Sequence, residues 1–114
     1  MVTKSWVPDA GELIWLTFDP QAGREQAGRR PALVLSPLNY NRKSGLAIVC
    51  PITSRLKGYP FEVPLPEGLR MTGAVLADHL KSLDWRERRA ESAGRVPPEL
   101  LREVLDRLVP LLGL

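Results

Sequence analysis

The side chains best able to do chemistry in this sequence are cationic. Seven Lys or Arg residues and a single acid, Glu25, fall between Arg24 and Tyr59, although the formal net charge of the whole chain is only +3. A positive segment of this kind attracts polyanions, and the planar guanidinium of Arg suits phosphate oxygens and base edges. The pattern favours nucleic acid as the partner, with an ordinary solvated, Arg-rich surface as the alternative.

Cysteine and histidine are too few for several kinds of site. The chain has one cysteine, Cys50, and one histidine, His79. These counts exclude an internal disulfide, a structural zinc site and two-histidine acid–base catalysis within one subunit. Cys50 ends the apolar run of residues 46–50, which predicts a buried and inert thiol.

Short apolar runs bounded by turn residues predict the strands that must position these groups. Leu80, Leu83 and Trp85 are expected to point inward from the last run. The predicted strands lie at residues 13–18, 32–35, 46–50, 61–63, 74–77 and 80–85. A loop of residues 19–31 separates the first two, and loops of that length in small domains usually carry function.

The C-terminal segment has a helical period. Apolar residues recur from Leu101 to Leu112 with charged residues on the opposite face. Pro97, Pro98 and Glu99 provide a helix start, and Pro110 limits its continuation. The apolar stripe is expected to contact the core or a second copy of the chain rather than a membrane, because the polar face is mixed in sign.

Length and composition fit one domain spanning residues 1–114. The chain has 44% hydrophobic and 25% charged residues, which is typical of an ordinary globular protein. No apolar run is long enough to cross a bilayer, and the first residues lack the apolar core of a secretion signal. A cytoplasmic location is therefore expected.

In its motifs the sequence resembles the MazF/PemK family of toxins from bacterial toxin–antitoxin systems, and most closely the chromosomal MazF branch. The likeness begins at residue 7 and rests on the order and spacing of several segments. These are GELIW at 11–15, FDP at 18–20, EQAGRRP at 25–31, VLSP at 34–37, PIT at 51–53, KGYPFEV at 57–63 and ADHLKSLDWR at 77–86.

The resemblance implies a mainly β fold, a small SH3-like barrel of the CcdB/PemK type with a C-terminal helix, and a homodimer. It also implies metal-independent, sequence-specific cleavage of single-stranded RNA, with no cofactor, and a cognate MazE-like antitoxin. Matched residue by residue, it makes Arg30 and Thr53 catalytic and adds Glu25 as the candidate base. The loop of residues 19–31 thus carries two of the three implied catalytic groups.

The remaining contacts to RNA are expected from aromatic, polar and cationic side chains. Stacking, hydrogen bonds to base edges and neutralisation of phosphates would come from Phe18, Gln26, Arg55, Lys57, His79 and Lys81. His79 stands where many relatives have glutamine, so either it reads a base that differs from theirs or it is a structural histidine beside Asp78.

Simpler interpretations of the catalytic residues stay open at this point. Glu25 and Arg30 suit a surface ion pair, and Thr53 suits a bond to a turn backbone. Two other functions also fit the fold. One is a non-enzymatic toxin that poisons DNA gyrase, as the related CcdB toxins do, and the other is an RNA-binding barrel without catalysis. An acidic, disordered antitoxin segment would compete with RNA for the positive surface.

Overall fold

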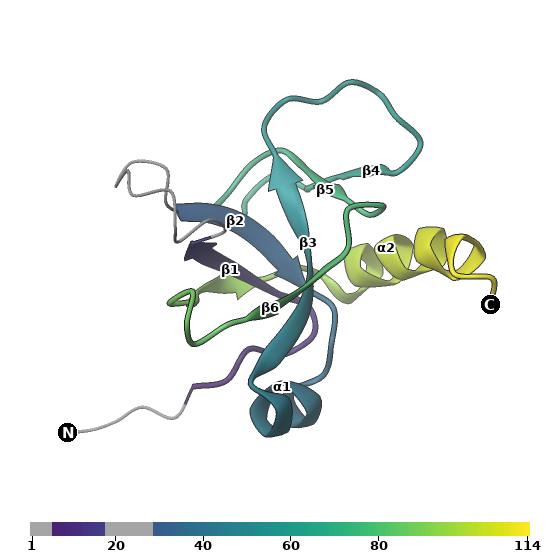
Figure 1. Cartoon of the computed structure of the whole chain (residues 1–114). Helices are drawn as coiled ribbons and strands as arrows, with labels where there is room; N and C mark the ends of the chain where they lie inside the picture. Colours follow the sequence, from purple (N-terminus) through teal and green to yellow (C-terminus); the bar gives the residue numbers. More distant parts are fainter. Residues whose placement is uncertain (1–5, 18–28) are drawn as a thin grey trace.

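A computed structural model of the chain describes residues 6–17 and 29–114. Seven strands form one antiparallel sheet in the order β4-β5-β3-β2-β1-β7, and β6 pairs with β3 beside β5 (Figure 1). The strands are β1 (Glu12–Thr17), β2 (Arg29–Val34), β3 (Leu46–Thr53), β4 (Glu62–Pro64), β5 (Ala74–Leu76), β6 (Lys81–Asp84) and β7 (Glu91–Arg95). Two helices complete the fold, α1 (Leu38–Ser44) and α2 (Pro98–Leu111).

The expected mainly β fold with a C-terminal helix is confirmed, and the barrel is an open one. The strands at the two ends of the sheet order, β4 and β7, do not pair with each other in the described part of the chain. β3 links the two halves of the sheet. Its first half pairs with β6 and its last residues, Ile52 and Thr53, pair with β5.

The three central strands are apolar on both faces. On β2, Leu33 packs into the core cluster beneath α2, whereas its neighbours Ala32 and Val34 pack into a second cluster on the opposite face of the sheet. Successive side chains of a strand point to opposite faces. These strands are covered on both sides, which explains why they appear in the sequence as continuous apolar runs rather than alternating ones.

Two predicted details of the strands were wrong. Arg29 and Arg30 belong to β2 and not to the preceding loop, since they pair with Thr17 and Leu16 of β1. Proline has no backbone N–H to donate to a neighbouring strand. Pro31 is tolerated in β2 because β3 pairs with β2 only from Ala32 onward, so the β2–β3 ladder needs no N–H from residue 31.

The other error concerns Leu80. This side chain is 39% exposed, whereas Leu83 and Trp85 are buried as expected. Leu80 precedes β6 and lies three residues before Leu83, a spacing that does not keep two side chains on one face of a strand.

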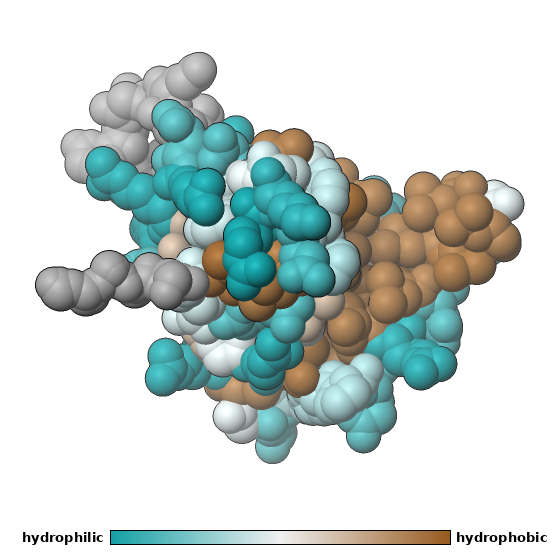
Figure 2. All heavy atoms as spheres, turned by 90° about the horizontal axis from the view of Figure 1, so that it is seen from below, coloured by the Kyte–Doolittle hydropathy of each residue, from teal (hydrophilic) through white to brown (hydrophobic). Residues whose placement is uncertain are grey.

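Helix α2 begins at Pro98, as the sequence predicts, and ends one residue after Pro110. Its inner face buries Leu100, Val104 and Leu108 against the sheet. Leu105, Val109, Leu111 and Leu112 stay exposed, and Figure 2 shows apolar side chains gathered along this helix toward the C-terminus. Only part of the predicted apolar stripe therefore serves the core.

None of the helices within residues 6–17 and 29–114 is long and apolar enough to cross a membrane.

Cys50 is buried as expected, and burial together with the nearby negative charge of Asp78 raises the pKa of its thiol to about 12. The unfolded thiol has a pKa of about 8.5. The folded state therefore holds this proton more tightly, and the resulting stabilisation is complete below the unfolded pKa and fades as the pH rises toward 12.

We predict that Cys50 resists iodoacetamide at pH 8 in the folded protein and reacts once guanidinium unfolds it, because the thiolate is the nucleophile. Mass spectrometry of quenched samples measures the labelled fraction. A Ser82→Cys variant, which has a thiol at an exposed position of β6, is the positive control. Labelling of folded Cys50 as fast as that of the control thiol would contradict the prediction.

Candidate functional site

A cavity lies over the start of β2 and the end of β3. It has a volume of about 1070 Å³. Five of its lining side chains are Lys or Arg, and no Asp or Glu is among the lining residues that the structure describes. The five are Arg29, Arg30, Arg55, Arg70 and Lys81. A surface of one sign in a concave site raises the local concentration of anions.

Arg30 and Thr53 come together here through the register of β2 and β3. The ladder pairs Ala32 with Pro51 and Leu33 with Cys50. Continued by two residues, the same register sets Arg30 across from Thr53, and both side chains line the cavity. Residues separated by 23 positions in the chain thereby line one cavity.

The two adjacent arginines of β2 have different roles. Arg29 forms an ion pair with Glu91 of β7 at 2.7 Å and donates to the carbonyl oxygens of Trp15 and Arg88. The side chain of Arg30 has no hydrogen bond or ion pair within residues 6–17 and 29–114. Arg29 therefore fixes the strand end against its neighbours, and Arg30 keeps its guanidinium available for a ligand.

The Thr53 hydroxyl accepts a hydrogen bond from the backbone N–H of Arg55 at 3.1 Å. The turn bond that the sequence suggested is thus present. A hydroxyl can donate one hydrogen bond while it accepts others, so Thr53 still has its proton to offer to an oxygen in the cavity. The turn bond orients the hydroxyl and does not exclude a role in binding.

The other predicted contacts divide into three groups. Arg55, His79 and Lys81 line the cavity with Arg30 and Thr53. Lys57 lines a smaller cavity beside it. Phe18, Glu25 and Gln26 lie outside the described residues.

His79 is an exposed side chain rather than a structural histidine. Its Nε2 lies 3.8 Å from Oδ1 of Asp78, which is beyond hydrogen-bond distance. The ring is more than half exposed at the mouth of the cavity. This position favours contact with a ligand over a role in the core.

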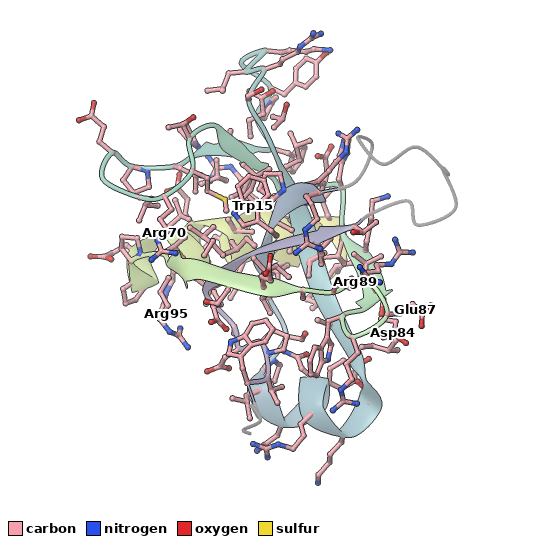
Figure 3. All side chains as sticks on the ribbon, turned by 90° about the vertical axis from the view of Figure 1, so that its left-hand side faces the viewer. Trp15, Arg70, Asp84, Glu87, Arg89 and Arg95 are labelled. Carbon is pink, nitrogen blue, oxygen red and sulfur yellow. The ribbon has the colours of Figure 1, made fainter. Side chains whose placement is uncertain are left out.

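Some lining residues were not predicted. Trp15 contributes from β1, and Arg70, Met71 and Thr72 contribute from the loop before β5. Figure 3 shows Trp15 near the middle of the sheet and Arg70 on that loop, on the side of the molecule away from Asp84 and Glu87 in the β6–β7 turn. Arg70 belongs to no motif, and the only signal in the sequence was a charged residue in the segment between two predicted strands.

The donor set of the described residues offers no cation site. No group of three or more His, Cys, Asp or Glu side chains lies close enough to hold a metal ion in residues 6–17 and 29–114. The groups gathered in the cavity are hydrogen-bond donors, namely guanidinium, ammonium, imidazole and hydroxyl. Such groups bind and stabilise a phosphate that carries negative charge.

Comparisons with known proteins identify the family of this chain. The family model described as "PemK-like, MazF-like toxin of type II toxin-antitoxin system" matches residues 9–112. The endoribonuclease toxin MazF of Escherichia coli is 50% identical over 108 residues, covering 95% of this chain and 96% of that protein. The endoribonuclease PemK of Escherichia coli is 36% identical over 109 residues, covering 91% and 81%.

Solved structures give the same result. MazF from Deinococcus radiodurans superposes with a TM-score of 0.87 at 61% identity, covering 96% of this chain and 100% of that one. A MazE–MazF complex from the same organism gives a TM-score of 0.89 at 60% identity, covering 96% and 99%. The chain therefore belongs to the family of PemK-like, MazF-like toxins of type II toxin–antitoxin systems, and it is a MazF-type endoribonuclease.

Proposed function

We propose that the chain cleaves single-stranded messenger RNA at short sequence motifs by attack of a ribose 2′-OH on the adjacent phosphate, and that this cleavage inhibits translation and growth. The P–O2′ bond forms, the P–O5′ bond breaks, and the products carry a 2′,3′-cyclic phosphate and a 5′-hydroxyl. The observation that carries this proposal is the presence of Arg30 and Thr53, from adjacent strands, in one cation-lined cavity.

RNA brings its own nucleophile, so the protein has to align the reacting atoms, move protons and stabilise the pentacoordinate phosphorus. A metal-activated water is not needed for this reaction. Arg30 binds the non-bridging phosphate oxygens with its planar donors and also donates a hydrogen bond to the leaving 5′-oxygen. Thr53 donates a hydrogen bond from its hydroxyl to the same phosphate.

Glu25 is the proposed base that takes the proton of the 2′-OH, since a carboxylate is ionised at neutral pH and the residue lies five positions from Arg30 in the chain. It lies outside the described residues, as do Phe18 and Gln26. For Phe18 we propose stacking on a base, and for Gln26 a hydrogen bond to a base edge.

Backbone phosphates on either side of the cut are proposed to contact Arg55, Lys57 and Lys81, and His79 is proposed to contact a base. The cation-lined cavity supports these assignments because phosphate contacts supply much of the affinity for nucleic acid. Arg70 joins this group, since it lines the cavity from the loop before β5 and has no ion-pair or hydrogen-bond partner within the described ranges.

A MazE-like antitoxin is the proposed partner, as MazE–MazF complexes are among the similar solved structures. An acidic segment would compete with RNA for the cation-lined cavity.

We also propose a homodimer. Exposed Leu105 and Val109 on α2, with Leu112 just after it, supply the kind of apolar patch that marks a protein contact (Figure 2).

The position of Thr53 depends on the glycine packed against it. Gly73 has a φ of +123°, and a Cβ there would collide with the carbonyl of Thr53. Thr53 also pairs with Ala74, the next residue. The absence of a side chain at residue 73 therefore lets β5 approach the end of β3.

Arg30→Ala should lower the rate of RNA cleavage by about 100- to 1000-fold, the usual cost of losing one donor to a developing oxyanion. Thr53→Val should also lower it, and Thr53→Ser should retain most of the activity because it keeps the hydroxyl. Cleavage of an oligoribonucleotide in EDTA, with analysis of the product ends, measures the effect.

The matched control is Arg102→Ala, which removes an exposed guanidinium from the polar face of α2 and should cleave at the parental rate. A substrate with 2′-deoxyribose at the scissile position should not be cut. Cleavage of that substrate would refute attack by the 2′-OH. Undiminished toxicity of Arg30→Ala in cells would instead support a gyrase poison, and RNA binding without turnover would support a non-catalytic barrel.

Gly73→Ala should reduce cleavage at least tenfold, because the new methyl group must displace the Thr53 backbone and because residue 73 has a conformation that L side chains rarely adopt. Initial rates with one substrate measure this effect, and circular dichroism checks the fold. Gly68→Ala is the control, since it has φ +95° but no atom within 4 Å of the new Cβ. Equal rates for the two variants would contradict a positioning role for residue 73.

Arg70→Ala should weaken binding of a non-cleavable, 2′-deoxy-substituted RNA to a similar degree for different sequences. It should also reduce the slope of log affinity against log salt concentration by about one, because one phosphate contact is lost. Fluorescence anisotropy at several salt concentrations measures both quantities. An unchanged salt dependence would remove Arg70 from the phosphate contacts.

A further inference from the structure

A second, smaller cavity opens beside the Arg30 cavity. Its volume is about 220 Å³. Four residues line both cavities, so the two form one continuous surface. They are Thr53, Arg55, Leu76 and His79. A nucleotide bound with its phosphate at Thr53 would therefore have the second cavity within reach of its own base or its neighbour's.

The loop between β3 and β4 forms one wall of this cavity and is held in shape by a buried acid. Glu62 is 8% exposed, and its carboxylate accepts the backbone N–H groups of Lys57 and Gly58 at 2.9–3.1 Å. Arg107 of α2 donates from Nε to the carbonyl of Pro60 at 2.8 Å. The wall is thus built before any ligand arrives, which reduces the entropic cost of binding.

An aromatic ring on this wall has no structural role that explains it. Tyr59 is 59% exposed and lines the cavity together with Phe61, which packs partly into the core. The ammonium of Lys57 lies 5.9 Å from the centroid of the Tyr59 ring. Exposed aromatic rings beside cations are the usual platforms on which unpaired bases stack.

Two acids line this cavity, Glu62 and Asp78. The Glu62 carboxylate already accepts the loop N–H groups, which leaves Asp78 to meet a ligand. The Asp78 side chain is 44% exposed, and its nearest ionic neighbour is the His79 ring at 3.8 Å. An ionised carboxylate can only accept hydrogen bonds. It therefore matches the exocyclic amino groups of adenine, cytosine and guanine, and it repels the carbonyl oxygens that uracil presents in their place.

The size of the cavity limits its occupant. Sites for drug-sized ligands have volumes of about 300–1000 Å³, and this cavity is smaller, at about 220 Å³. It suits one planar ring system rather than a larger group. Stacking on Tyr59 and acceptance by Asp78 would then act on the face and the edge of the same base.

We propose that the cavity formed by Tyr59, Phe61 and Asp78 is a subsite for one nucleobase next to the cleaved phosphate, and that Asp78 selects bases with an exocyclic amino group over uracil. The inference rests on the proposed function, because it assumes that RNA occupies the adjoining cavity. It makes Tyr59 and Asp78 specificity residues that do not touch the reacting atoms.

The test begins with the motif that the parental protein cuts, read from the 5′-hydroxyl ends left in mixed RNA. Oligoribonucleotides varied one position at a time around that motif should reveal a position where uracil lowers the cleavage efficiency by about tenfold or more. Asp78→Asn should accept uracil there nearly as well as the preferred base, because an amide both donates and accepts hydrogen bonds. Asp106→Asn, the same change at an exposed position of α2, should keep the parental preference.

A second pair of variants tests the stacking surface without relying on Asp78. Tyr59→Ala should weaken binding of a non-cleavable, 2′-deoxy-substituted RNA by about tenfold, whereas Tyr59→Phe should bind as tightly as the parent. An unchanged base preference in folded Asp78→Asn would overturn the selection by Asp78. Equal affinities of the two Tyr59 variants would overturn the stacking.

Failure of the subsite and failure of the proposed function give different results. Parental protein that cuts RNA while the variants keep its base preference would refute the subsite and leave the proposed function intact. Parental protein that cuts no RNA would refute both. If Asp78→Asn does not fold, the binding measurements on the Tyr59 pair still decide whether the cavity holds a stacked base.

Discussion

The antiparallel register between β2 and β3 is the constraint on which the rest of the structure depends. It brings Arg30 and Thr53 to one cavity. It is fixed by burial on both faces of the sheet, with Leu33 and Cys50 in one core cluster and Val34 and Val49 in the other. A slip of one residue would turn every side chain of β2 to the opposite face. It would exchange the side chains that pack in the two core clusters and turn Arg30 away from the face that it now occupies. The same core packing that stabilises the fold therefore also fixes the site.

The parts of the fold that could be predicted are those in which burial leaves a pattern in the sequence. The central strands appear as apolar runs, and α2 appears through its helical period and its proline start. Strand β7 has no such signal. Only Ala93 is buried in the sequence ESAGR, and the strand exists because β1 offers it a partner. Helix α1 is also polar, and its one buried side chain, Asn41, bonds to carbonyl groups of Pro8 and Ser36, which only the folded chain brings together.

The candidate site was predictable to the extent that motifs cover it. Arg30 and Thr53 lie in segments typical of the family, but composition and spacing cannot distinguish Arg30 from Arg29 beside it. The difference comes from strand alternation and from Glu91, which lies 62 residues away in the chain and forms an ion pair with Arg29. Trp15 and Arg70 join the cavity only through tertiary structure, as do Tyr59 and Asp78 in the adjoining one. In each case the missing information was which loop lies opposite which strand, a question that local sequence does not answer.

The isolation of Cys50 has a practical consequence. The chain contains no other cysteine. Cys50 is fully buried in β3, and its sulfur points toward the backbone carbonyl of Ala77. A cysteine introduced on the surface would be the only accessible thiol, without any need to disturb the core by first removing the native one. A single fluorophore or spin label could then be attached to the β3–β4 loop or to α2, and its signal would report on that element alone when a ligand binds.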